Sequence, residues 1–129
     1  MLCHCKSTKV YALCCRPIIL GQIPARTAEE LMRSRYSAYC IADVDYLMQS
    51  HHTSTRPIKD KSSILRWTKS VSWLGLQIIS KKAGGPTDNE GWVEFKATYL
   101  ENGLLQCIHE HSYFVKEKGL WYYQSGVHQ

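Results

Sequence analysis

The second half of the chain alternates apolar and polar side chains, a pattern typical of β-strands. Residues 92–99 alternate cleanly, and Val, Trp and Ile are frequent in the stretch before them. Asn102 and Gly103 tolerate the positive φ angles of a tight hairpin turn, and Gly, Pro, Asp and Asn mark residues 83–89 as a loop. We therefore expect four strands of an antiparallel meander, over residues 71–81, 92–99, 104–115 and 120–125.

The first half has the apolar spacing of helices. Thr27 is a good N-cap, and Glu29 and Glu30 follow in the first turn, where the helix dipole favours acidic side chains. Residues 17–24, bounded by two prolines and with Gly21 between them, are expected to form a connector. We expect three helices, over residues 28–41, 44–50 and 59–70. Helices followed by an antiparallel meander predict an α+β domain with helices packed on a four-strand sheet.

The composition narrows the class of protein. With 129 residues, 44% hydrophobic and 21% charged, the chain is long enough for one globular domain. The formal net charge is +5, but the basic residues are scattered, which argues against sequence-specific nucleic-acid binding. No apolar run approaches the ~20 residues that span a bilayer, and the N-terminus lacks the apolar core of a secretion signal. We therefore expect a cytoplasmic protein with reduced cysteines.

Most of the cysteines lie at the N-terminus, in two close pairs separated by a short loop: Cys3, Cys5, Cys14 and Cys15. This spacing is typical of a tetrahedral zinc site, and the alternative is a set of four free thiols. Because four thiolates leave no position for water, such a zinc would be structural. His4 is expected to point away from the metal. Cys40 and Cys107, in a predicted helix and strand, are expected to be core thiols.

Arg35 falls on the apolar stripe of the predicted helix 28–41. A guanidinium in that position must either extend to water or meet a buried carboxylate. Glu94 and Glu110, both in the middle of predicted strands, are the candidate partners. Arg35 marks the place where a pocket is expected, and the commoner alternative is a structural role, either an ion pair or extension to water.

The predicted strand 104–115 has two mixed faces. Glu110 and Ser112 lie on one face, His109 and His111 lie on the other, and both faces also carry apolar side chains. Either set could line a ligand cavity or simply be exposed. The chain has no phosphate-binding glycine loop, nucleophile elbow or His-Glu-x-x-His sequence, so no motif indicates a reaction.

Several segments resemble a known family. Cys3-x-Cys5-x-Ser7 followed by Cys14-Cys15 resembles the SEC-C zinc motif. Residues 27–39 resemble the signature of the YchJ-like family of uncharacterised bacterial proteins. Further matching segments follow in that family's order, at residues 52–57, 93–99, 109–114 and 119–123. The resemblance thus covers essentially the whole chain.

The resemblance implies a fold similar to nuclear transport factor 2, a cone of curved sheet around helices, preceded by a zinc knuckle. The knuckle would occupy residues 1–20 and the cone residues 21–129. The SEC-C motif usually has glycine where Lys6, Thr8 and Arg16 stand here. Because a β-branched residue resists positive φ, we expect Thr8 to affect the shape of the loop more than the metal.

Two functions from different classes are consistent with these observations. We favour a zinc-stabilised binding or interaction module that docks on a protein or the ribosome, as SEC-C segments do elsewhere. The alternative is a small enzyme of the isomerase or dehydratase type, with Glu94, Glu110 or His109 as acid or base. Tyr99 or Tyr113 would then be the hydrogen-bond donor, and a tyrosine facing a carboxylate in a cavity would favour the enzyme.

The cone could also bind a small-molecule ligand, and folds of this type often pair through the open face of the sheet. The candidate pocket residues are Arg35, Tyr39, His52, Arg56, Glu94, His109, Glu110 and Ser112, of which His52 and Arg56 come from the resemblance alone.

Overall fold

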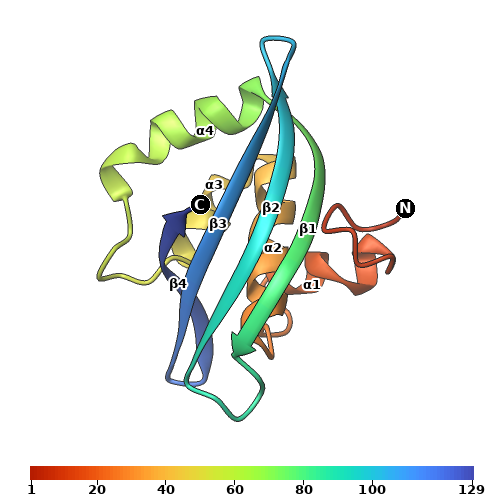
Figure 1. Ribbon diagram of the computed structural model, residues 1–129. Helices are drawn as coiled ribbons and strands as arrows, with labels where there is room; N and C mark the ends of the chain where they lie inside the picture. Colours follow the sequence, from red (N-terminus) through yellow and green to blue (C-terminus); the bar gives the residue numbers. More distant parts are fainter.

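Four antiparallel strands form one curved sheet in the computed structural model, which describes residues 1–129 (Figure 1). Each strand pairs with the next along the chain, so the strand order is β1-β2-β3-β4. The strands are β1 (Ser72–Ala83), β2 (Glu90–Glu101), β3 (Leu104–Glu117) and β4 (Leu120–His128). The predicted meander is confirmed. The strands run past their predicted C-terminal ends because pairing with neighbouring strands continues there.

Tight turns join the last three strands. Asn102 and Gly103 have φ angles of 52° and 77°, and Lys118 and Gly119 have φ angles of 52° and 81°. Two consecutive positive φ angles match the right-handed twist of the flanking strands. The predicted Asn-Gly turn is therefore confirmed, and the second hairpin uses the same backbone geometry.

Four α-helices precede or cover the sheet: α1 (Cys15–Ile19), α2 (Ala28–Ile41), α3 (Val44–Gln49) and α4 (Lys61–Ser70). The prediction for α2 is confirmed, including the cap, because Thr27 Oγ1 accepts a hydrogen bond from Glu30 N at 3.0 Å. Single 3-10 turns precede α1 and α4, at Tyr11–Leu13 and Ile58–Asp60. None of the helices combines the length and the apolar character that crossing a membrane requires.

Helix α1 corrects the predicted connector, part of which is helical. Pro17 lies in the first turn of this helix. A proline is tolerated there because its missing N–H would have no partner within the helix. The connector therefore begins inside a helix, and its irregular part follows Ile19.

Helix α2 lies behind the sheet in Figure 1 and supplies the centre of the core. Its Leu31, Met32 and Tyr36 are buried together with Val93 and Phe114 from the sheet. The core continues into the N-terminal segment, because three of its cysteines belong to the same hydrophobic cluster. The boundary between a knuckle and a cone after residue 20 stays a prediction.

Pairing between β2 and β3 shows which face of β3 looks inward. Val93 is paired with Ser112 and Phe95 with Glu110. Val93 and Ser112 are both buried, and Phe95 and Glu110 line an internal cavity. Successive side chains on a strand alternate between faces, so His109 and His111 lie on the outer face.

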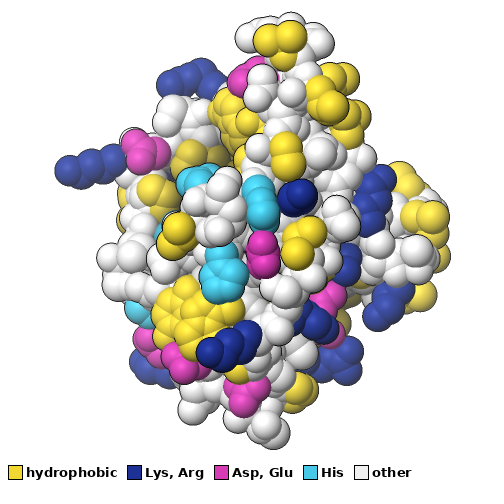
Figure 2. All heavy atoms as spheres, in the orientation of Figure 1, with side chains coloured by type: hydrophobic (Ala, Val, Ile, Leu, Met, Phe, Trp, Pro, Cys, Tyr) yellow, Lys and Arg dark blue, Asp and Glu magenta, His cyan; other side chains and the backbone are white.

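Figure 2 shows this outer face, where histidine, charged and apolar side chains are mixed. Glu94 Oε2 lies 2.7 Å from His109 Nε2, and Ser80 Oγ donates to Glu94 Oε1 at 3.0 Å. The hydrogen bond with His109 lowers the pKa of Glu94 below its ordinary value. Pairing of two copies through this face stays a prediction.

Candidate metal centre and cone cavity

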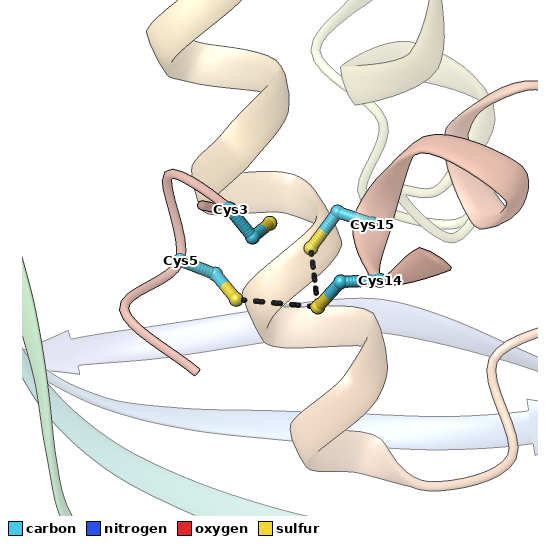
Figure 3. Close-up of side chains that lie close together, drawn as sticks. All are labelled: Cys3, Cys5, Cys14 and Cys15. Atoms are coloured by element: carbon cyan, nitrogen blue, oxygen red, sulfur yellow. Dashed lines mark hydrogen bonds between the residues drawn. The ribbon is translucent and has the colours of Figure 1, made fainter. Parts of the chain in front are cut away.

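Four cysteine sulfurs converge between the N-terminal loop and the start of α1 (Figure 3). The Sγ atoms of Cys3, Cys5, Cys14 and Cys15 all lie within 4.8 Å of one another. The Cys5–Cys14 and Cys14–Cys15 sulfur separations are 3.7 and 4.0 Å. Sulfurs at the corners of a tetrahedron with metal–sulfur bonds of about 2.3 Å would be about 3.8 Å apart. The geometry therefore fits a four-coordinate metal ion.

Ionisation of one sulfur in the cluster affects the ionisation of its neighbour. A hydrogen bond with Cys15 lowers the pKa of Cys5 to about 4, while the same contact, followed by burial, raises the pKa of Cys15. One thiolate thus opposes ionisation of its neighbour. A divalent cation would remove this conflict, because it binds thiolates and compensates their charge.

Side chains of helix α2 hold the cysteine segment in place. Arg33 Nη1 donates to the carbonyl oxygen of Cys5 at 2.6 Å, and Arg33 Nε donates to Glu29 at 2.8 Å. Cys3 Sγ lies 3.5 Å from Ser37 Oγ on the same helix. A cationic side chain beside four thiolates favours their charged form. These contacts fix the loop on the helix from which Arg35 also projects.

The loop between Cys5 and Cys14 has the backbone that the glycines of the SEC-C motif would provide. Lys6 and Thr8 have φ angles of 65° and 71°. These angles lie in the left-handed region, which a β-branched residue enters only with strain. Thr8 therefore adopts this conformation at the cost of local strain, while Arg16 lies within helix α1.

The remaining cysteines and His4 lie outside this cluster. The ring of His4 packs edge-to-face on Tyr11, with centroids 5.2 Å apart. Cys40 is partly buried, and burial raises the pKa of its thiol to about 11. The prediction of a core thiol is wrong for Cys107, which is exposed because it lies on the outer face of β3.

A second candidate site lies inside the cone. A cavity of about 240 Å³ is lined by side chains from the helices and from the inner face of the sheet, and 13 of its 18 lining residues are hydrophobic. Aromatic rings form much of the wall: Tyr36, Tyr39, Trp67, Trp73, Phe95, Phe114 and Tyr123. Apolar walls with a few convergent polar groups are typical of small-molecule sites.

Arg35 contributes a buried guanidinium to this cavity. The residue is 8% exposed, and its Nη1 donates to the carbonyl oxygen of Leu47 at 2.8 Å and to Ser50 Oγ at 2.7 Å. Its Cζ lies 4.7 Å from the centroid of the Tyr123 ring. The predicted direct pairing of Arg35 with a carboxylate is wrong, because a carbonyl, a hydroxyl and an aromatic face are its partners instead.

Glu110 is the carboxylate of the cavity. Its Oε2 accepts hydrogen bonds from Ser112 Oγ and, at 3.1 Å, from the hydroxyl of Tyr123. Burial, and then the charge of Glu110, raise the pKa of Tyr123, which therefore stays protonated as a donor. Gly126 on the neighbouring strand leaves the space that this carboxylate occupies. Glu110 can therefore hold a proton or accept a hydrogen bond from a bound molecule.

His51 also lines the cavity. Burial, followed by the charges of Arg35 and Arg56, lowers its pKa to about 4. The imidazole is therefore neutral near pH 7, and its Nε2 lies 3.1 Å from Thr55 Oγ1. Arg35 is thus the one cationic side chain in the lining at that pH.

Four of the predicted pocket residues line the cavity and four do not. Arg35, Tyr39, Glu110 and Ser112 line it. Glu94 and His109 pair with each other on the outer face of the sheet. The other two, His52 and Arg56, belong to surface contacts: His52 Nε2 lies 2.6 Å from Glu117, and Arg56 Nε donates to the His51 carbonyl just beyond helix α3.

Sequence reasoning missed Tyr123, the tyrosine that contacts the carboxylate. Tyr99 packs instead with Trp67 and Trp73, and Tyr113 donates to Glu90 at 2.8 Å. Period-two alternation along β4, starting from the buried Trp121, would have placed Tyr123 on the inner face.

Comparisons with known proteins agree with this architecture. Residues 27–126 match the family model described as YchJ, middle NTF2-like domain. A UPF0225 protein of Geobacter sulfurreducens is 41% identical over 125 residues, which is 97% of this chain and 78% of that protein. The UPF0225 protein YchJ of Shigella dysenteriae is 38% identical over 126 residues, which is 98% of this chain and 82% of that protein.

Two solved structures of SEC-C motif-containing proteins superpose closely. The protein from Rhodopseudomonas palustris gives a TM-score of 0.88 at 34% identity, covering 98% of both chains. The protein from Psychrobacter arcticus gives 0.83 at 30% identity, covering 97% of this chain and 81% of the other. Both the cone and the N-terminal segment are therefore shared with proteins named for the SEC-C motif.

Proposed function

The chain belongs to the YchJ-like family, and from its sulfur cluster and cavity we propose that it is a zinc-stabilised domain that binds a small molecule inside the cone. The observation that carries this proposal is the cavity of about 240 Å³ with Arg35, Glu110 and Tyr123 in its wall. An apolar cavity of about 150 Å³ is already large enough to bind benzene. Drug-sized ligands occupy roughly 300–1,000 Å³, so the expected ligand is smaller than these.

Zinc is the metal that we propose for the four thiols. Soft thiolates in a tetrahedral set select Zn²⁺ over magnesium or calcium, which take oxygen ligands. Because all four positions belong to cysteines, the ion would stabilise the segment rather than supply chemistry. Its expected effect is to fix the N-terminal loop on helix α2.

Titration with 3-phenylpropan-1-ol, an uncharged probe with a flat apolar body, tests the cavity. The amide resonances of residues in the cavity lining, such as Ala97, should shift, while those of the cysteine segment should not. Ala97→Leu adds side-chain volume inside the cavity and should abolish binding. Thr98→Leu, on the opposite face of the same strand, is the matched control and should bind normally. Shifts confined to the outer surface, or binding unaffected by Ala97→Leu, would contradict the proposal.

The contact between Tyr123 and Glu110 favours an acid–base role for this cavity as a second candidate. Glu110 would be the base and the Tyr123 hydroxyl the donor. An enzyme would then turn over its ligand, and Glu110→Gln would keep binding but lose turnover. Binding of a ligand without its conversion would support a binding domain that is not an enzyme.

Exposed apolar side chains on the N-terminal segment favour docking on a ribosome or protein partner. Leu2 and Leu13 are 64% and 80% exposed, and basic Lys6 and Lys9 lie on the same segment. Co-sedimentation with purified ribosomes tests this role. Leu13→Ser should weaken co-sedimentation, whereas Leu105→Ser on the outer face of the sheet should not. Equal sedimentation of the two variants would argue against ribosome docking.

A further inference from the structure

The guanidinium of Arg35 is buried without an anionic partner. No acidic oxygen lies within ion-pair distance, since none of the ion pairs of the molecule includes Arg35. Both of its hydrogen bonds come from Nη1. An arginine has five N–H donors; those on Nε and Nη2 make no hydrogen bond with the protein and, because they are not among its buried unpartnered atoms, they face accessible space.

Glu110 does not serve as the counter-ion, because Tyr123 lies between the two charges. The guanidinium lies over the tyrosine ring, while the tyrosine hydroxyl donates to Glu110 at 3.1 Å. The carboxylate also accepts from Ser112, which is fully buried. The carboxylate of Glu110 is thus met by two hydroxyls and by His128, whose Nε2 lies 3.8 Å from Oε1, and the positive charge of Arg35 is left facing the cavity.

Trp73 adds a second donor without an acceptor. Its ring lines the cavity, and its Nε1 is buried with no hydrogen-bond partner. Buried donors that lack an acceptor destabilise a protein. A molecule in the cavity that carries acceptor oxygens would satisfy such groups.

We propose that the ligand is a small organic monocarboxylate with a flat apolar body, held by the free donors of Arg35. The apolar body would lie against aromatic side chains of the lining such as Trp67 and Phe95. The planar fork of a guanidinium matches the two oxygens of a carboxylate. A single cationic side chain, with Glu110 near it, favours one negative charge over the two of a phosphate monoester. This inference rests on the proposed function, because it names the chemistry of the ligand in the same cavity.

The test compares two probes that differ only at one end, 3-phenylpropanoate and 3-phenylpropan-1-ol, with wild-type protein at pH 7. Titration calorimetry should give an affinity at least tenfold higher for the carboxylate. The side-chain Nε–H resonance of Arg35 should shift with the carboxylate and not with the alcohol. This readout uses the wild-type protein and does not depend on any variant folding.

Three results would overturn the inference, and they separate it from the proposed function. Equal affinities for the two probes would refute the carboxylate but leave a cavity that binds small molecules. Failure of both probes to bind would refute the proposed function as well. Carboxylate binding that leaves the Arg35 resonance unchanged would place the ligand elsewhere.

A pair of arginine variants adds a control for overall charge. Arg35→Met should reduce carboxylate affinity to that of the alcohol. Arg66→Met removes the same charge from the exposed surface of α4 and should leave the preference intact. A preference that survives Arg35→Met in folded protein would also overturn the inference.

Discussion

Replacing Gly126 by alanine should displace the carboxylate that organises the cavity. A Cβ built at this position overlaps Oε2 and Cδ of Glu110 and lies 2.7 Å from the Tyr123 hydroxyl oxygen. Van der Waals contact requires well over 3 Å, so the carboxylate must move by on the order of 1 Å. The hydrogen bonds from Tyr123 and Ser112 would then break or lengthen.

The magnitude follows from two contributions. Overpacking in a filled interior costs about 1–3 kcal/mol, and each hydrogen bond to a charged group contributes about 1.5–3 kcal/mol. The side chain of Glu110 is 13% exposed and can relieve part of the overlap by turning toward water. We therefore expect a loss of about 2 kcal/mol in the free energy of unfolding, or about 6–8 °C in melting temperature for a domain of this size.

Gly75→Ala is the matched control for this variant. It places the same methyl group on another strand, where the nearest atom is Thr98 Oγ1 at an ordinary 3.6 Å. Neither glycine has a positive φ angle, so the backbone cost is the same at both positions. Urea denaturation followed by circular dichroism should separate the variants by about 2 kcal/mol. A difference below about 0.5 kcal/mol, comparable to ordinary surface substitutions, would refute the described placement of Glu110.

Three further predictions concern the metal centre and pH. Cys14→Ser should release the metal and loosen the N-terminal segment while the cone stays folded. The control Cys107→Ser should retain one metal ion by elemental analysis. Collapse of the whole domain in Cys14→Ser would show that the segment is not separable. Arg33→Met removes the hydrogen bond to the Cys5 carbonyl. Chelator competition should therefore show a metal affinity about tenfold lower. An unchanged affinity would show that Arg33 does not support the metal site. The folded-state pKa of His51, about 4, lies below the ordinary value of 6.5. The stabilising contribution of the neutral imidazole is therefore complete above pH 6.5 and is lost as the pH falls toward 4. Wild-type protein should lose more stability over this interval than His51→Gln, and parallel pH profiles of the two proteins would contradict the lowered pKa.

Local signals in the sequence predicted most of the architecture. The Thr27 cap, the Asn102–Gly103 turn and period-two alternation placed helix α2 and the sheet correctly. These features depend on neighbouring residues only, and a sequence displays them directly. The cysteine cluster was similarly accessible, because its ligands lie within the first fifteen residues.

The interior of the cavity was less accessible, because it depends on register between strands. Strand β3 has mixed faces, so its own pattern does not show that Glu110 points inward and His109 outward. That distinction comes from pairing with β2, where Phe95 is opposite Glu110. A shift of one residue would have exchanged the two faces.

The environment of Arg35 depends on contacts between distant segments. Helical periodicity placed the side chain on the apolar stripe, and its burial agrees with that placement. Its acceptors come from α3 and the end of that helix, and the ring it lies against comes from β4. Pairing rules for charges suggested a carboxylate, whereas the fold supplied the Leu47 carbonyl and the face of Tyr123.

A crystal structure of the protein grown with 3-phenylpropanoate, with anomalous data collected at the zinc edge, would test the account most directly. One anomalous peak should lie equidistant from the four N-terminal sulfurs, and a carboxylate should lie within hydrogen-bond distance of Arg35 Nε and Nη2. A sulfur cluster without a zinc signal, or a cavity filled by protein side chains with the probe excluded, would contradict it.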